Sequence, residues 1–255
     1  NTPSSTVDVV DAEEGTVTGS IPVGLEPIAL ALKPDKSELW VSNHLSDSVN
    51  VIDLDPGSPT FHQVIGLIDA SSYQEADRYF DEPAGIAFAS NAKAYVALSQ
   101  ENQIAVIDAA RLKITKTIAV PAQDPRAITV FEDKLFVLPF ESNNQTQLSG
   151  CLPSKIDGER CTFDAIEHVF TNNNVLSLNY VADIVKNPEL PDRDLLVYDT
   201  SSEQLIETVE GLGTLLYGIT VTESGQVVIA QTDARNDANG LAGSAGHGLA
   251  ELENR

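Results

Sequence analysis

The first candidate for chemistry in this sequence is a histidine next to an asparagine. His44 follows Asn43 directly after an apolar and aromatic run, and a neutral imidazole can act as a base or a metal ligand. Glu141 and Gln231 stand at the ends of two similar runs. These four residues are therefore candidates for a ligand-binding site. The sequence holds no G-x-S-x-G motif and no evident Ser-His-Asp order, so no catalytic residue is assigned.

A second candidate site lies in a polar run near the C-terminus. Asp233, Asn236, Asp237 and Asn239 precede Gly240, and Ca²⁺ prefers carboxylate and amide oxygens close to a turn. The spacing departs from a calcium loop of the EF-hand type, because Arg235 would take the first ligand position. The run is read either as a Ca²⁺ site or as a solvated turn.

The two cysteines indicate the compartment. Cys151 and Cys161 lie close together in a polar segment, and we expect them to form a disulfide in an oxidising environment. Their spacing is not that of a zinc site. The sequence starts at Asn1 and contains no Met, so we expect a removed leader or a piece of a longer chain. Together with the acidity, these features predict a periplasmic or extracellular protein.

Composition excludes several classes of partner. The chain has 255 residues with 15 Lys and Arg against 38 Asp and Glu, a formal net charge of −23. Such a charge repels phosphate backbones, so binding of nucleic acid is not expected. No apolar run is long enough to span a bilayer as a helix. With 42% hydrophobic residues, the chain can still bury a full core.

Internal repeats place these residues on a fold. A short apolar run ending in aspartate recurs at Asp11, Asp53, Asp108 and Asp199, 42, 55 and 91 residues apart. Two further runs recur between these aspartates, as in Pro27 to Leu30 and Leu39 to Asn43. Repeats of about 42 residues with four short strands are typical of β-propeller blades. We therefore predict an all-β fold of about four antiparallel units, with strands A (innermost) to D in each.

The two larger spacings imply insertions of roughly 13 and roughly 49 residues beyond the propeller period. Spacing within each unit places the first at about 66–82 and the second at about 140–193, followed by a Gly-rich and Ala-rich tail at 232–255. The pattern of residues 71–80 predicts a short helix capped by Ser71 or Ser72. Because the insertions join strands D to A and B to C, both should lie on one face, the insertion face. The repeated aspartates should close tight turns on the opposite face.

The sequence resembles the YVTN-type β-propeller repeat family of bacterial surface-layer and periplasmic proteins. The residues that carry the resemblance are Ile21 to Pro27, Lys33 to Asp35, Leu39 to Asn43 and Ser48 to Asp53. The resemblance implies a propeller of about seven blades. The present chain would then be either part of such a propeller or a four-bladed ring closed by residues 7–22 and 215–231. Some long relatives of this family carry a c-type haem region further along, but no CxxCH motif occurs here.

Two functional hypotheses follow from the sequence. The first is a non-catalytic scaffold that binds a protein, a glycan or a small ligand on the insertion face. The second is an enzyme or a redox partner: a metal-dependent hydrolase resembling propeller lactonases, with a metal held near Asn43, Glu141, Gln231 and Asp233, or the propeller part of a larger c-type haem protein.

Overall fold

The computed structural model of the chain describes residues 1–75, 78–141, 146–148, 184–186, 192–213, 215–234 and 252–253. It divides into two compact units. Unit 1 comprises Asn1–Phe140, Leu195–Glu207 and Tyr217–Ile229, and unit 2 comprises Glu141–Asp194, Thr208–Leu216 and Ala230–Arg255. In the described part of the chain, helix is confined to three 3₁₀ turns, Thr2–Ser4 (η1), His44–Ser46 (η2) and Ala70–Ser72 (η3).

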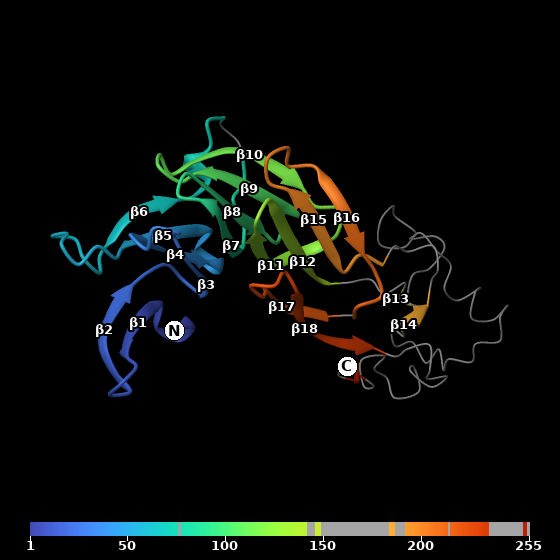
Figure 1. The fold of residues 1–255 in the computed structure, drawn as a ribbon, viewed down its shortest axis with the longest axis horizontal. Helices are drawn as coiled ribbons and strands as arrows, with labels where there is room; N and C mark the ends of the chain where they lie inside the picture. Colours follow the sequence, from blue (N-terminus) through green and yellow to red (C-terminus); the bar gives the residue numbers. More distant parts are fainter. Residues whose placement is uncertain are drawn as a thin grey trace. The chain divides into compact units, whose positions relative to one another are not determined.

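The described strands form three complete blades and two half-blades (Figure 1). The N-terminal half-blade is β1 (Thr6–Asp11) and β2 (Thr16–Pro22); the first blade is β3 (Pro27–Leu32), β4 (Glu38–Asn43), β5 (Ser48–Asp53) and β6 (Val64–Ile68). The second blade is β7 (Pro83–Ser90), β8 (Lys93–Leu98), β9 (Gln103–Asp108) and β10 (Lys113–Ala119). The third blade is β11 (Gln123–Phe131), β12 (Lys134–Glu141), β15 (Leu195–Asp199) and β16 (Leu205–Val209). The C-terminal half-blade is β17 (Leu215–Val221) and β18 (Val227–Ala234), and it shares one sheet with the third blade because β17 pairs with β12 at Leu215 and Glu141. The other described strands are short: β13 (Thr146–Leu148), β14 (Ile184–Lys186) and β19 (Leu252–Glu253).

The order of strands within a blade is the predicted order A, B, C, D. The first blade runs β3-β4-β5-β6 and the second runs β7-β8-β9-β10, all antiparallel. In the third blade, the residues from the end of β12 to the start of β15 form the long B to C insertion, and β12 still pairs with β15. The prediction of an all-β fold built from four-stranded antiparallel blades is confirmed.

The repeated aspartates have the structural role predicted for them. The Asp11 carboxylate accepts hydrogen bonds from the backbone N–H groups of Glu13 (2.8 Å) and Glu14 (3.0 Å). These bonds hold the pKa of the Asp11 carboxyl below its usual value. Asp108 accepts two backbone N–H bonds in the same way, as does Asp199. Each carboxylate therefore closes the turn between strands C and D.

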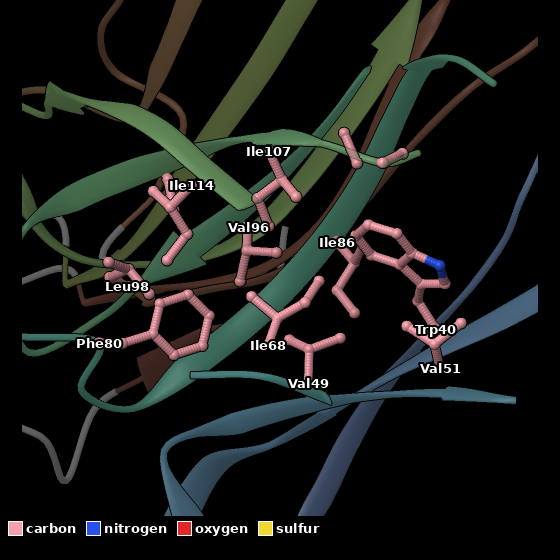
Figure 2. Close-up of a cluster of buried hydrophobic side chains, with 13 residues drawn as sticks. Trp40, Val49, Val51, Ile68, Phe80, Ile86, Val96, Leu98, Ile107 and Ile114 are labelled. Carbon is pink, nitrogen blue, oxygen red and sulfur yellow. The ribbon is translucent and has the colours of Figure 1, made fainter. Parts of the chain in front are cut away.

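The core lies between facing blades. Trp40, Val49, Val51 and Ile68 of the first blade pack against Ile86, Val96, Ile107 and Ile114 of the second (Figure 2). Phe80, from the segment between these blades, is buried in the same cluster. A second cluster joins the second and third blades through Tyr95, Ile104, Leu135 and Tyr198. A sheet stacked between two others needs apolar residues on both faces, and β8 and β9 are accordingly buried along nearly their whole length.

The structure corrects the position of the first insertion. Residues 66–68 lie in β6. The C to D connection from β5 to β6 runs over residues 54–63, whereas the corresponding turn takes only residues 12–15 in the N-terminal half-blade and 109–112 in the second blade. The long turn still closes on Asp53, which accepts bonds from the Asp55 N–H (2.9 Å) and the Thr60 hydroxyl (2.7 Å). The extra residues are therefore shared between residues 54–63, on the face opposite the insertion face, and residues 69–82.

The helix predicted over residues 71–80 is also wrong where the structure describes it. Asp69, and not Ser71 or Ser72, is the N-cap, and its carboxylate accepts from the Ser71 N–H at 2.8 Å. The turn ends at Ser72 because Tyr73 is extended and bridges to Ile114 at the edge of β10. Residues 76 and 77 lie outside the described residues. No helix in the described residues is long and apolar enough to cross a membrane.

Candidate functional site

In the first and second blades, one polar residue of the B to C turn organises the insertion face of unit 1. Asp47 precedes strand β5, and its carboxylate accepts a hydrogen bond of 3.0 Å from the backbone N–H of Glu82, just before β7. Asn102 in the second blade accepts at 2.8 Å from the N–H of Asp124, at the start of β11. Both residues are in the left-handed region, with φ of 47° and 50°. A polar side chain thus fixes the path of the chain from one blade to the next.

His44 begins η2 in the B to C turn of the first blade, and its side chain is mostly buried. Its Nε2 is 3.8 Å from Oε2 of Glu82, and its Nδ1 is buried without a hydrogen-bond partner. The Ser99 hydroxyl donates to the same Glu82 carboxylate at 3.2 Å. The arrangement places an imidazole and a carboxylate close together at the surface.

The other carboxylates nearby repel one another. Burial, followed by the charges of Asp47 and Glu82, raises the pKa of the Asp81 carboxyl above its usual value. Burial and the charge of Asp81 also raise the pKa of Glu101. The described residues contain no group of three or more His, Cys, Asp or Glu placed to hold a metal ion. The cluster is thus a negatively charged surface without the geometry of a metal centre.

An aromatic and cationic cluster lies on the inner strands, and sequence analysis missed it. The guanidinium of Arg126 (β11) lies over the ring of Phe140 (β12), 4.5 Å from its centre. Phe140 meets Tyr217 (β17) edge to face, with ring centres 5.4 Å apart. The Arg126 Nε donates to Asp124 at 2.8 Å, and Tyr217 is 53% exposed. We call Arg126, Phe140 and Tyr217 the aromatic platform.

The aromatic platform lies at the insertion face because its residues are near the strand ends that face this side. Arg126 and Tyr217 are near the starts of two A strands, and Phe140 is near the end of a B strand. These ends meet the D to A and B to C connections. The sequence offered one signal, an aromatic or cationic residue close to each of these ends, but the pairing across strands needed coordinates.

The remaining predicted site residues divide into four cases. Asn43 is fully buried; its amide donates to Ser48 (3.2 Å) and Asn50 (2.9 Å), so it holds the B to C turn and is not accessible to a ligand. Gln231 lies in β18 of unit 2, with its Oε1 buried and unpaired. Glu141 ends β12 and Asp233 lies in β18, and their side chains are not among those described. Asn236, Asp237, Asn239, Cys151 and Cys161 lie outside the described residues.

Comparison with known proteins leaves the fold as the shared feature. No known protein family and no curated protein matches the sequence. A chain of Kuenenia stuttgartiensis hydrazine synthase superposes with a TM-score of 0.60 at 22% identity, over 92% of this chain and 52% of that one. The WD40 β-propeller domain of Doa1 gives 0.54 at 6% identity, over 88% and 54%. A chain of the mitotic checkpoint complex gives 0.55 at 10% identity, over 89% and 51%.

This chain spans about half the length of each of these three structures. At such identities the likeness concerns architecture, since one propeller fold carries many functions. The stacked four-stranded blades and the superpositions agree, and the chain has the fold of a β-propeller.

Proposed function

We propose that this chain is a non-catalytic propeller scaffold and that its insertion face binds a protein partner. The partner would contribute basic and aromatic side chains to the contact. The observation that carries the proposal is the aromatic platform, in which Tyr217 is 53% exposed. In the D to A and B to C connections of unit 1, burial and neighbouring carboxylates raise the pKa of Asp81 and of Glu101. A cation placed beside Asp81 and Glu101 would relieve their repulsion. An exposed aromatic ring offers a large apolar contact with little entropy to lose, which favours Tyr217 as an anchor.

The charge of the chain favours a basic partner. The chain carries a formal charge of −23, which steers basic segments toward it and repels acidic ones. Arg126 does not oppose such a partner, since Asp124 neutralises its charge. A glycan stacked on Tyr217 is the alternative that the test must separate.

The test uses a synthetic peptide of alternating lysine and tyrosine as the probe, with binding measured by calorimetry. Tyr217→Ala is expected to weaken binding about tenfold, the effect of losing about 1.4 kcal/mol. Asp81→Asn with Glu101→Gln should weaken it and reduce its salt dependence. Phe61→Ala, in the long turn of residues 54–63, is the matched aromatic control and should bind as the wild type does.

Two results would overturn the proposal. One is equal affinity of the peptide for the wild type and for Tyr217→Ala. The other is binding of a neutral oligosaccharide, chitohexaose, with no binding of the peptide, which would assign the platform to a glycan.

We also propose that the chain is a periplasmic or extracellular protein of the YVTN-type repeat family, with a disulfide between Cys151 and Cys161. The repeat pattern and the acidity support this. Alkylation of the unreduced protein under denaturing conditions, followed by mass measurement, should add no label. Labelling of both cysteines would contradict the disulfide. The likeness to hydrazine synthase is one of fold, so no redox role is proposed from it.

A further inference from the structure

The outer edge of the first blade is an apolar strand that no charged side chain protects. Strand β6 is the outermost strand of its four-stranded sheet, and among the described strands it pairs only with β5 (Figure 1). An open edge exposes backbone N–H and C=O groups to another strand, and proteins commonly place lysines or other charges there. The outermost strands of the next two blades follow this rule, with Lys113 and Lys116 in β10 and Glu207 in β16. Residues 56–68, which form β6 and most of the turn before it, contain no Asp, Glu, Lys or Arg.

The free part of this edge is apolar. Ile68 is fully buried in the cluster between the first and second blades, and a Cβ on Gly66 would collide with the side chain of Leu112 in the second blade. Four other large apolar side chains, each between 38% and 65% exposed, remain accessible at the edge; they are Phe61, Val64, Ile65 and Leu67. We call these four residues the rim patch. Single exposed apolar residues are ordinary, whereas a contiguous group of them marks a contact surface.

The charge of the chain limits which partner can cover the rim patch. The net charge of −23 attracts basic segments to the carboxylates of the surface, but the rim patch offers a basic residue no counter-ion. A charged partner strand would lose hydration against Val64 and Leu67 without gaining an ion pair. The surface that fits is an uncharged, apolar strand with an open edge. A second copy of β6 has each of these properties.

We infer that two copies of this chain associate through their rim patches, with the two β6 strands antiparallel to each other. Each copy gives and receives the same surface, as in most two-fold dimers. Ile65 is the extra residue of a bulge opposite Val51 and Ile52, so regular pairing is open to residues 66–68. Leu67, in the middle of these three, would then meet its own copy across the two-fold axis. The rim patch belongs to other strands than the aromatic platform, and the inference goes beyond the proposed function.

The charge of the two copies gives this contact a distinctive salt dependence. Each copy carries a formal charge of −23, so the copies repel one another, and the rim patch supplies no ion pair. Raising the salt from about 0.1 M to about 1 M shortens the Debye length from roughly 10 Å to roughly 3 Å and weakens this repulsion. The dimer should therefore become tighter as salt is added, whereas binding of the lysine and tyrosine peptide should become weaker. The sign of the salt effect thus separates the inference from the proposed function.

The first experiment measures the mass of the 255-residue chain by light scattering at these two salt concentrations. The expected mass at the higher salt is that of two 27.3 kDa chains. Leu67→Lys should weaken the dimer about a hundredfold, because a loss of about tenfold occurs twice in a symmetric contact. Leu45→Lys is the matched control: it makes the same change of charge at a leucine 65% exposed in η2, and should dimerise as the wild type does. Phe61→Ala should weaken the dimer and leave peptide binding unchanged.

The inference fails on any of three results. One is a wild-type chain that stays monomeric at micromolar concentration in the higher salt. Another is a dimer that Leu67→Lys and Leu45→Lys weaken equally. The third is a dimer that added salt weakens, since ion pairs would then hold it together.

A second experiment needs no substitution, so it does not depend on the folding of a variant. Amide hydrogen exchange of the wild-type chain is followed by mass spectrometry, in dilute solution as the monomer and in concentrated solution as the dimer. Peptides covering residues 61–69 should exchange more slowly in the dimer, because pairing covers the outer N–H groups of β6. Peptides covering β10, an outermost strand with two lysines, are the control and should exchange equally in both. Equal exchange of residues 61–69 in the two states, or protection of β10 instead, would overturn the inference.

Discussion

The Nζ of Lys93 lies 2.5 Å from Oε1 of Glu203 and so joins the second blade to the third. Glu203 is buried, and Lys116 forms an ion pair with its other oxygen. Burial alone would lower the pKa of Lys93, but its hydrogen bonds to Glu203 and Tyr95 outweigh burial and raise the pKa. Burial would likewise raise the pKa of Glu203, but the two lysines outweigh it and lower the pKa. The pair is thus a charged link between two blades, in addition to the apolar cluster and the Asn102 to Asp124 hydrogen bond that also join them.

Removing one partner of this link should destabilise the protein. Lys93→Ala is expected to lower the free energy of unfolding by about 2 kcal/mol, because the Glu203 carboxylate stays buried with a single, more exposed partner. Lys116→Ala should cost about 0.5 kcal/mol, since Lys116 is largely exposed. Urea unfolding at neutral pH measures both. If Lys116→Ala and Lys93→Ala lowered the free energy of unfolding equally, burial of the lysine would not determine how much each ion pair stabilises the protein.

The C to D turns make stability depend on acid pH, and Asp199 offers the clearest test. The Ser201 hydroxyl, and then the Ser202 N–H and hydroxyl, lower the pKa of the Asp199 carboxyl far below its ordinary value of 3.8. A carboxyl whose pKa is lower in the folded than in the unfolded state stabilises the fold fully above pH 3.8, and this stabilisation is lost as the pH falls below that value. Asp199→Asn should therefore have a lower melting temperature than the wild type at pH 7, and the gap should narrow below pH 3.8. A gap that stays constant with pH would contradict this, and Glu14→Gln serves as the exposed control.

The sequence predicted the strands well because each repeat carries local signals. The apolar run ending in Asp53 and the Pro27 turn mark strands that the structure places as expected. The failures came from effects that local pattern does not carry. The segment after Ser72 leaves the helical path because Tyr73 pairs with the distant Ile114, and the aromatic platform joins side chains from three strands. Burial of Asn43 likewise depends on its hydrogen bonds to Ser48 and Asn50, which lie on the neighbouring strand β5.

The carboxylates of the insertion face should respond to one another. Asp47→Asn keeps an oxygen that can accept the Glu82 N–H bond but removes a charge that raises the pKa of Asp81. We expect the pKa of Asp81 to fall in this variant, as followed by carboxyl carbon shifts in an NMR titration, with little change in stability. Asp47→Ala should show the same fall and also lose about 1 kcal/mol of stability, because the Glu82 N–H loses its partner. An unchanged Asp81 titration in both variants would mean that Asp47 does not act on it.

The close approach of two inner strands makes one glycine indispensable. A Cβ on Gly85 of β7 would lie 2.5 Å from the Arg126 carbonyl oxygen and 3.0 Å from the Ile128 nitrogen, both backbone atoms of β11. Backbone atoms cannot move aside as the end of a flexible side chain can, so the strands would have to separate. Gly85→Ala should therefore cost about 1–3 kcal/mol of unfolding free energy. Gly218→Ala, in β17 with no atom within 4 Å of its Cβ, should be neutral or slightly stabilising. An equal free energy of unfolding in the two variants would contradict the close approach of the two strands. Arg126 belongs to the aromatic platform, so Gly85→Ala should also weaken binding of the lysine and tyrosine peptide. Gly218→Ala should leave that binding unchanged.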